Sequence, residues 1–130
     1  MKAKISRVLR ELRTELKSIY GPRLASVILF GSQARGDAAP ASDIDVLVVL
    51  DGNVEAGKEI ARTGRTVAAL SLKFDLVISC IFISAERYSR EQTPLLLNIR
   101  NEGVAISTRK GNKVLMGVPV LAGKPQEDML

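Results

Sequence analysis

Apolar residues recur at intervals of three and four along the start of the chain, with Arg, Lys and Glu between them. This spacing predicts an amphipathic helix over residues 3–19, which the pair Gly21-Pro22 ends. Two short runs of β-branched and apolar residues follow, and they predict buried strands over residues 25–30 and 43–50. The turn residues 51–53 close the second strand.

The second half of the chain alternates helical and extended patterns. Its predicted elements are a helix over 54–72, a strand over 73–83, a helix opening at Ser84, a helix from Thr93-Pro94 to Gly103, and an edge strand over 104–107. Residues 109–130 mix Gly, Pro and charge without sustained periodicity. We interpret them as a C-terminal tail or partner-contacting arm.

The order of these elements predicts an α/β (α+β) fold, with a small mixed β-sheet and helices packed on it. Only a short turn or helix over 33–36 fits between the first two strands, so we expect those strands to be antiparallel. A chain of 130 residues is long enough for one hydrophobic core. We therefore assign residues 1–108 to a single domain.

Net charge and composition limit the kinds of ligand and active site that the chain can have. The formal net charge of +5 suggests an anionic partner, but the Lys and Arg residues are spread along the chain. This favours a phosphate-bearing ligand or an acidic protein surface and argues against nucleic acid. The chain has no His and only Cys80, which excludes His-dependent triads, disulfides and Cys/His zinc clusters. A charged N-terminus and the lack of a membrane-spanning apolar stretch predict a cytoplasmic protein.

Two acidic residues, separated by one residue, lie at the start of the second predicted strand. Side chains at i and i+2 of a strand share a face, so Asp43 and Asp45 should project together while Ile44 and Val46 pack in the core. Like charges there repel and raise each other's pKa unless a cation lies between them, and Mg²⁺ suits such oxygen ligands. In the alternative interpretation, Ser42 and Asp43 cap a turn and Asp45 faces solvent.

A Gly-Ser pair directly after the first predicted strand changes that balance. Gly31 allows a phosphate to approach the backbone closely, and the Ser32 hydroxyl can bond a phosphate oxygen. Taken alone, the pair is more typical of a simple tight turn than of a phosphate site. Together with the two acids across a short loop, it predicts a phosphate-binding turn that faces a metal-binding pair.

This stretch resembles a known family. Gly31-Ser32, ten further residues and Asp43-Ile44-Asp45 match the Gly-Ser-x10-Asp-x-Asp signature of the DNA polymerase beta-like nucleotidyltransferase superfamily. In size the chain is similar to the minimal nucleotidyltransferases, including the antitoxin partners of HEPN toxins. The resemblance implies a third carboxylate on a neighbouring strand, and Asp75 is the candidate; its alternative role is an acid at the exposed start of that strand.

The resemblance also implies an activity. We expect Mg²⁺-dependent transfer of a nucleoside monophosphate, AMP from ATP, to an acceptor hydroxyl, which the family likeness suggests is a Tyr of a HEPN-type toxin. Asp43, Asp45 and Asp75 would be the catalytic residues and ligands of two Mg²⁺ ions, and Gly31 and Ser32 would bind the nucleotide. A non-catalytic, antitoxin-like binding module with a vestigial nucleotide site is the alternative function. Self-association as a homo-oligomer stays open.

Overall fold

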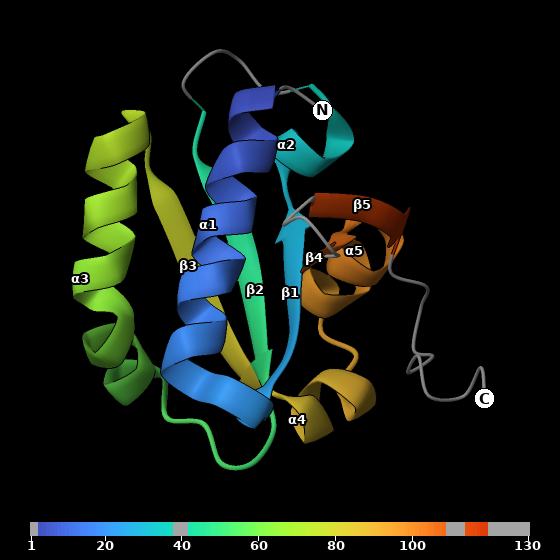
Figure 1. Cartoon of the computed structure of the whole chain (residues 1–130). Helices are drawn as coiled ribbons and strands as arrows, with labels where there is room; N and C mark the ends of the chain where they lie inside the picture. The colour runs from blue at the N-terminus through green and yellow to red at the C-terminus, as the bar shows by residue number, and fades with distance from the viewer. Residues whose placement is uncertain (1–2, 38–41, 109–113, 120–130) are drawn as a thin grey trace.

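The computed structural model describes residues 3–37, 42–108 and 114–119. Its elements, in chain order, are α1 (Ala3–Tyr20), the 3-10 turn η1 (Gly21–Arg23), β1 (Leu24–Phe30), α2 (Ser32–Arg35), β2 (Ile44–Leu50), α3 (Ala56–Phe74), β3 (Ile78–Ser84), α4 (Ala85–Arg90), α5 (Pro94–Glu102), β4 (Val104–Thr108) and β5 (Val114–Pro119). Figure 1 shows α1 and α3 side by side in front of the sheet, with α4 and α5 behind it.

The sheet has five strands in the order β3-β2-β1-β4-β5. β1 is antiparallel to both β2 and β4, β4 is antiparallel to β5, and β2 and β3 are parallel. The long helix α3 makes the crossover that this parallel pair requires. The predicted mixed sheet and the antiparallel pairing of the first two strands are both confirmed.

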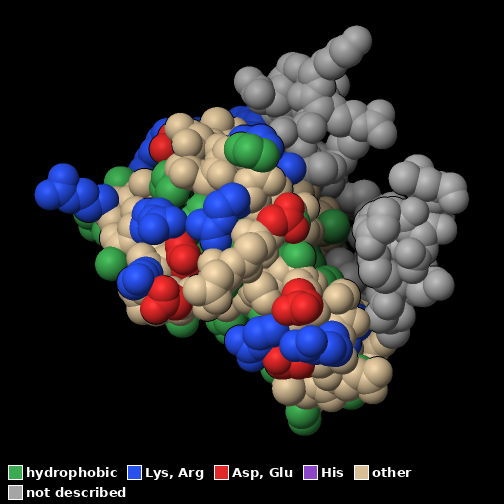
Figure 2. Space-filling view, turned by 90° about the horizontal axis from the view of Figure 1, so that it is seen from below, with side chains coloured by type: hydrophobic (Ala, Val, Ile, Leu, Met, Phe, Trp, Pro, Cys, Tyr) green, Lys and Arg blue, Asp and Glu red, His purple; other side chains and the backbone are tan. Residues whose placement is uncertain are grey.

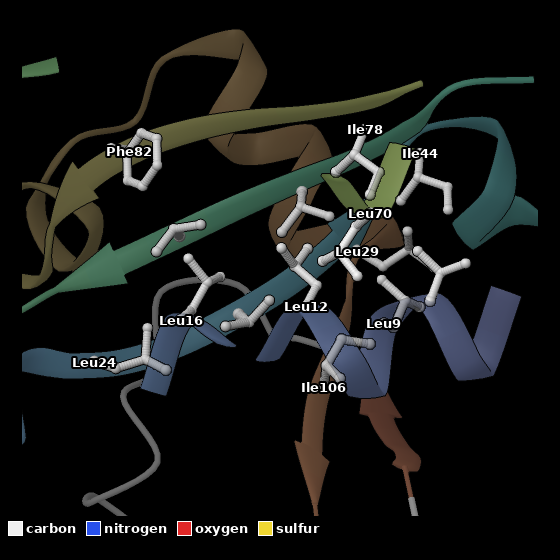
Figure 3. Close-up of a cluster of buried hydrophobic side chains, with 14 of the residues drawn as sticks. Leu9, Leu12, Leu16, Leu24, Leu29, Ile44, Leu70, Ile78, Phe82 and Ile106 are labelled. Carbon is white, nitrogen blue, oxygen red and sulfur yellow. The ribbon is translucent and has the colours of Figure 1, made fainter. Parts of the chain in front are cut away.

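The main hydrophobic core lies between the sheet and the helices α1 and α3 (Figure 3). Leu9, Leu12 and Leu16 recur at helical spacing on α1 and are completely buried. Beneath them lie alternate residues of β2, including Ile44 and Val46, which are also fully buried. Burying each such side chain contributes about 1.5–3 kcal/mol, so the apolar face of α1 fixes the helix on the sheet.

A smaller cluster on the opposite face joins the other residues of β2 to α5. Leu47 and Val49 of β2 pack there with Ile28, Ile83, Leu96 and Ile99. Asp45 has the same parity along β2 as Leu47 and Val49, so its side chain belongs to this face. The acid therefore projects toward the side of the sheet that α4 and α5 cover only in part.

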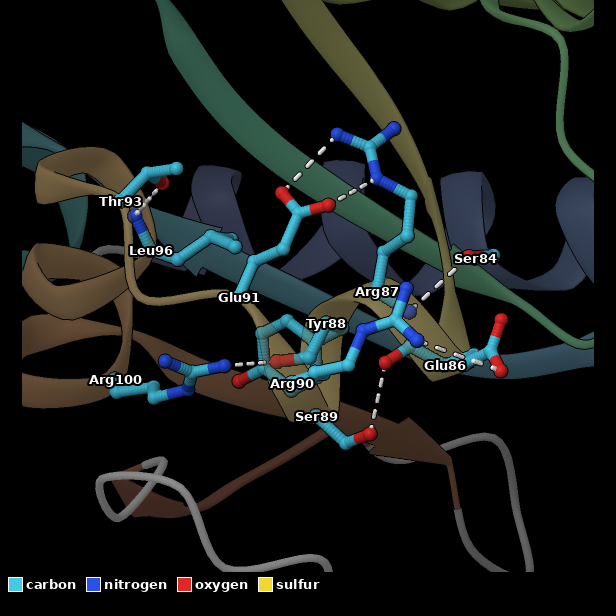
Figure 4. A network of polar contacts seen from close by, with 10 residues as sticks. All are labelled: Ser84, Glu86, Arg87, Tyr88, Ser89, Arg90, Glu91, Thr93, Leu96 and Arg100. Atoms are coloured by element: carbon cyan, nitrogen blue, oxygen red, sulfur yellow. Dashed lines mark hydrogen bonds and ion pairs between the residues drawn. The ribbon is translucent and has the colours of Figure 1, made fainter.

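A side-chain cap begins each of α4 and α5, and one buried arginine joins the two helices (Figure 4). The Ser84 hydroxyl accepts a hydrogen bond from the Arg87 amide, and the Thr93 hydroxyl accepts one from Leu96, as predicted for a helix that opens at Thr93-Pro94. The Arg100 guanidinium donates to the Tyr88 carbonyl and lies over the Tyr88 ring, 5.1 Å from its centroid. The two contacts between Arg100 and Tyr88 join α5 to α4.

The third strand begins later than the sequence predicts. Residues 73–83 are apolar apart from Lys73, Asp75 and Ser79, and we expected all of them to be extended. In the structure α3 continues to Phe74, which is buried in the main core, and β3 starts only at Ile78. An apolar run of this length is compatible with the end of a buried helix as well as with a strand, and the core contact of Phe74 decides the matter.

Part of the predicted tail belongs to the sheet. Residues 114–119, which we interpreted as part of a tail or partner-contacting arm, form β5 and pair with β4 in an antiparallel ladder. The other residues of the predicted tail, 109–113 and 120–130, lie outside the described residues.

The end of the molecule with α4 and the start of α3 carries mixed charges (Figure 2). Ion pairs form there between Arg87 and Glu91 at 2.6 Å and between Lys58 and Glu55 at 3.0 Å. The cations seen on this side are interspersed with carboxylates and do not form one positive stripe of the kind that binds a phosphate backbone. None of the helices within the described ranges is both long and apolar enough to cross a membrane.

Candidate active site

The Gly-Ser turn lies where β1 ends, at the upper end of the sheet in Figure 1. Gly31 adopts φ 77° and ψ −158°, and its carbonyl accepts hydrogen bonds from the amides of Ala34 and Arg35 at 3.1 Å each. This backbone conformation is essentially restricted to glycine. The glycine lets the chain turn directly from β1 into the short helix α2, which Ser32 opens.

Asp45 lies directly beside this turn. Its Cα pairs with that of Phe30 in the β1–β2 ladder, one residue before Gly31. A Cβ atom placed on Gly31 would come within 2.6 Å of Asp45 Oδ2. The carboxylate thus occupies the space that any other side chain at position 31 would need, so the structure brings Gly31 and Asp45 together.

Asp43 lies just before β2 begins and is exposed, whereas Asp45 is half-buried. Burial raises the pKa of Asp45, and the negative charge of Asp43 raises this pKa further. The second effect requires the two carboxylates to be close enough to repel. Ile44 and Val46 are buried in the core as expected, so the two acids share the opposite face.

Gln33 joins the Gly-Ser turn to the backbone before the acids. Its Nε2 atom donates a hydrogen bond to the Ser42 carbonyl at 3.2 Å. The contact links α2 to the residue immediately before Asp43, across a loop of which residues 38–41 lie outside the described part. Sequence reasoning missed Gln33 because nothing in a short turn shows which side chain reaches back across the loop.

Arg35 is held by ion pairs on the surface. Its guanidinium contacts Asp37 and Glu102, each at 3.2 Å. These contacts are consistent with a surface ion-pair role for Arg35, and they connect α2 to the end of α5.

The Cys80 thiol is not placed to act as a nucleophile, because burial raises its pKa to about 12.

Asp75 is the residue at which α3 ends. It is exposed and terminates α3 in the left-handed conformation, with φ 54° and ψ 54°, and its amide bonds to the Leu72 and Ser71 carbonyls. The Leu76 amide bonds to Ser71 as well, at 3.1 Å, which completes the pattern of a helix C-terminal cap. Our expectation that Asp75 stands on a strand is wrong, because the chain is still leaving the helix at this residue.

The structure therefore brings together two of the three acids. Within the described ranges, no group of three or more His, Cys, Asp or Glu residues is placed to hold a metal ion. Asp43, and not Asp75, is the charge that perturbs Asp45. Two carboxylates beside a turn that admits a phosphate fit one hard divalent cation, which would take its remaining oxygens from phosphate and water.

The candidate site lies at the end of the sheet where β1 ends and β2 begins. A groove of about 350 Å³ opens elsewhere, between α1 and α3, and charged residues such as Glu11, Glu15, Arg65 and Lys73 line it. A salt bridge of 2.7 Å between Glu11 and Lys73 crosses this region. Because the groove lies over the helices that cover the other face of the sheet, it is separate from the acid pair.

Comparison with known families agrees with this geometry. The sequence profile of the nucleotidyltransferase domain matches residues 9–105, which include β1, the Gly-Ser turn, the acid pair and β3. The chain belongs to this family, and it is a nucleotidyltransferase of the minimal type. The predicted family resemblance is confirmed.

The chain is similar to an archaeal protein and to an archaeal crystal structure. The chain is 32% identical over 103 residues to "Putative protein adenylyltransferase MJ0141" of Methanocaldococcus jannaschii, covering 78% of this chain and 98% of that protein. A crystal structure described as "a putative nucleotidyltransferase from Sulfolobus solfataricus" matches with a TM-score of 0.54 and 21% identity, over 88% of this chain and 95% of that one.

A crystal structure described as "the toxin-antitoxin with AMP-PNP" also has a similar fold. It matches with a TM-score of 0.53 and 18% identity, over 79% of this chain and 77% of that one. At such identities the two structural matches establish the fold, and the fold is that of nucleotidyltransferases.

Proposed function

We propose that this protein transfers AMP from ATP to a hydroxyl of a partner protein, with Mg²⁺ held by Asp43 and Asp45. The observation that carries this proposal is the close approach of Gly31 to the Asp45 carboxylate, with Asp43 alongside. A phosphate-admitting turn and a hard-cation ligand pair thus lie in contact. The name of the M. jannaschii relative, a protein adenylyltransferase, supports AMP as the group transferred and protein as the acceptor.

Each residue of the site has a separate role in this reaction. Bound Mg²⁺ would neutralise triphosphate charge at the phosphorus under attack. The carboxylates of Asp43 and Asp45 would hold that ion, and Gly31 leaves room for the Asp45 carboxylate beside the turn. The backbone of this turn and the Ser32 hydroxyl would bind the phosphate oxygens. A bond then forms between the acceptor oxygen and the α-phosphorus, while the bond to the leaving pyrophosphate breaks. The acceptor proton passes to solvent or to a base.

We infer that the acceptor is a Tyr hydroxyl of a HEPN-type toxin. The likeness to a toxin-antitoxin structure that contains AMP-PNP supports a toxin partner and a nucleotide substrate. The basic net charge of the chain is compatible with an acidic partner surface. Tyrosine offers a hydroxyl that can reach an open site, and the acid pair is exposed enough to meet it.

A second candidate function is a non-catalytic module that neutralises its partner by binding. The position of Asp75 favours this alternative, because among the described residues no third carboxylate joins the pair in a group that could hold a metal ion. The intact Gly31, Asp43 and Asp45 favour the enzyme. The two functions differ in turnover, since a module would bind Mg-ATP without releasing pyrophosphate.

The test measures transfer directly. The chain is incubated with Mg²⁺, ATP labelled at the α-phosphate and a candidate HEPN-type partner, and both partner labelling and pyrophosphate release are followed. Asp43→Asn and Asp45→Asn should each lower transfer by on the order of 10²- to 10³-fold, as removal of an electrostatic stabiliser does. Asp37→Asn is the matched control, because Asp37 is an exposed acid on the same loop and is paired with Arg35.

Three results separate the alternatives. Labelling by wild type and Asp37→Asn, but not by the other two variants, supports the enzyme. Calorimetric binding of Mg-ATP without pyrophosphate release, in the presence of the partner, supports the module. Wild-type transfer by Asp43→Asn and Asp45→Asn would show that the metal site has been misplaced.

A further inference from the structure

The strand that carries Asp45 lies between two neighbours that offer a ligand different surroundings. The strand order β3-β2-β1 places β2 in the middle. On the β1 side Asp45 is paired with Phe30, the residue before Gly31. On the β3 side it is paired with Ser79. Adjacent strands are about 4.8 Å apart, so both sides are within reach of a ligand held at Asp45.

Two exposed apolar side chains flank Ser79 on β3. Ile81 follows Ser79 by two residues and is 40% exposed, and Val77 precedes it by two residues and is 54% exposed. The Ile44 amide donates a hydrogen bond to the Val77 carbonyl at 2.9 Å, so the parallel pairing of β2 and β3 extends to Val77. Side chains at i and i+2 of a strand share a face, and paired residues of neighbouring strands do so too. Val77, Ser79 and Ile81 therefore project on the same side as Asp45, and we call this surface the β3 strip.

The β3 strip is uncharged and lies at the margin of the sheet. Residues 76–84 include no Asp, Glu, Lys or Arg. The alternate residues Ile78 and Phe82 are buried in the main core, so the strip forms the face of β3 that points away from α1 and α3. Within the described residues β3 pairs with β2 alone, and Figure 1 shows it at the margin of the sheet. The strip is thus an apolar surface that adjoins the acid pair.

The stereochemistry of phosphoryl transfer distinguishes the two sides of Asp45. In an in-line displacement the attacking oxygen and the leaving group lie on opposite sides of the phosphorus. The Gly-Ser turn, at the end of β1, is the proposed holder of the phosphates, so pyrophosphate leaves on that side. The acceptor oxygen then reaches the α-phosphorus from the β3 side. Its new bond to phosphorus forms as the bond to pyrophosphate breaks, and the acceptor proton passes to solvent or to a base.

We propose that the β3 strip binds the acceptor segment of the partner protein. The hydroxyl-bearing residue approaches Asp45 from the side of Ser79, and apolar residues next to that hydroxyl pack on Val77 and Ile81. The inference rests on the proposed function, since it places the acceptor at the same site. An aromatic hydroxyl such as that of Tyr suits this surface, whereas a charged acceptor segment would lose hydration against it without gaining a partner of opposite charge.

The test replaces the apolar side chains of the strip one at a time. Val77→Ser and Ile81→Ser remove the proposed contacts. Ile60→Ser is the matched control, because Ile60 is 57% exposed and lies on α3, which covers the other face of the sheet. Thermal unfolding checks that each variant folds, and if one strip variant does not fold, the other decides.

Two readouts follow the partner and the nucleotide separately, with a candidate HEPN-type protein as the probe. Calorimetry gives the affinity for this protein in the presence of Mg²⁺ and a non-hydrolysable ATP analogue, and initial rates of transfer give KM for the protein and for ATP. Each strip variant should weaken partner binding and raise KM for the partner about 10-fold, as expected when a large aliphatic side chain loses its buried contact. Mg-ATP affinity, KM for ATP and all values for Ile60→Ser should stay at wild-type levels.

The outcomes separate this inference from the proposed function. Wild-type partner affinity in the folded strip variants, or an equal loss in Ile60→Ser, would overturn the β3 strip as the acceptor surface and leave adenylyl transfer intact. Weaker partner binding by the strip variants alone, in a chain whose wild type releases no pyrophosphate, would overturn the proposed function and assign the strip to the non-catalytic module. Weaker binding and a raised KM for the partner in the strip variants alone would support both.

Discussion

The sharpest prediction concerns Gly31→Ala, which adds a single methyl group at the contact between the turn and the acid pair. The new Cβ would meet Asp45 Oδ2 at 2.6 Å, and the Asp45 Cγ and Cβ atoms at 3.4 and 3.5 Å. The last two distances are ordinary contacts. The carboxylate oxygen alone is about 1 Å too close for van der Waals contact, so it must rotate or shift away from the turn.

Two costs follow, and they appear in different measurements. The backbone of Gly31, at φ 77° and ψ −158°, is strained for any residue with a Cβ, by about 1–3 kcal/mol. This strain lowers the free energy of unfolding. The displaced carboxylate affects function instead, because a misplacement of about 1 Å in a catalytic geometry can lower the rate on the order of 10²-fold.

Gly36→Ala is the control for backbone strain. Gly36 has φ 81° and ψ 10° at the end of α2, and a Cβ there would meet nothing within 4 Å. Its left-handed conformation should cost about 1–2 kcal/mol without touching the acids. Urea unfolding should show both variants destabilised, while calorimetry should show that only Gly31→Ala loses Mg-ATP affinity. Wild-type affinity in Gly31→Ala would refute the proposed contact.

Three further substitutions test the surroundings of the pair. Gln33→Ala removes the hydrogen bond to the Ser42 carbonyl, so it should lower Mg-ATP affinity in calorimetry while lowering the free energy of unfolding by only about 0.5–1.5 kcal/mol. Arg35→Ala removes two exposed ion pairs and should change unfolding in urea by less than about 1 kcal/mol and Mg-ATP affinity not at all; a clear loss of affinity would give Arg35 a role in binding. Asp45→Asn should raise the thermal midpoint at neutral pH without divalent cations, because the raised pKa of Asp45 means that its ionised form opposes folding above that pKa. A lower midpoint would show that the carboxylate is stabilising on its own.

Periodic patterns and short-range spacing carried the sequence predictions that succeeded. The three- and four-residue spacing on α1 predicted its buried face because a long helix must cover the sheet with one stripe. The short loop between β1 and β2 predicted antiparallel pairing for a geometrical reason. The alternation through Asp43 and Asp45 predicted a shared face, since side chains alternate strictly along a strand.

The errors concern features that depend on distant contacts. The end of α3 is set by the contact of Phe74 with the main core, which no local pattern contains. Asp75 falls within the mainly apolar run 73–83 that predicts a strand, and no glycine marks the left-handed helix cap there. β5 forms because β4 offers a partner edge, so the segment 114–119 needs no strong pattern of its own. In each case a tertiary partner overrides local propensity.

The acid pair combines two unfavourable features, and cation binding accounts for both. The fold half-buries Asp45 and keeps Asp43 close enough to raise the Asp45 pKa, although neither arrangement stabilises the ionised carboxylate. A bound cation reverses the sign of the second effect, because both carboxylates then act as ligands and their ionised forms are favoured. Mg-nucleotide at 100 times its dissociation constant should therefore stabilise the wild-type fold by about 2.7 kcal/mol. Asp45→Asn should lose that gain while being the more stable chain without ligand, and this opposition of signs distinguishes a binding site from an exposed acid at a strand end.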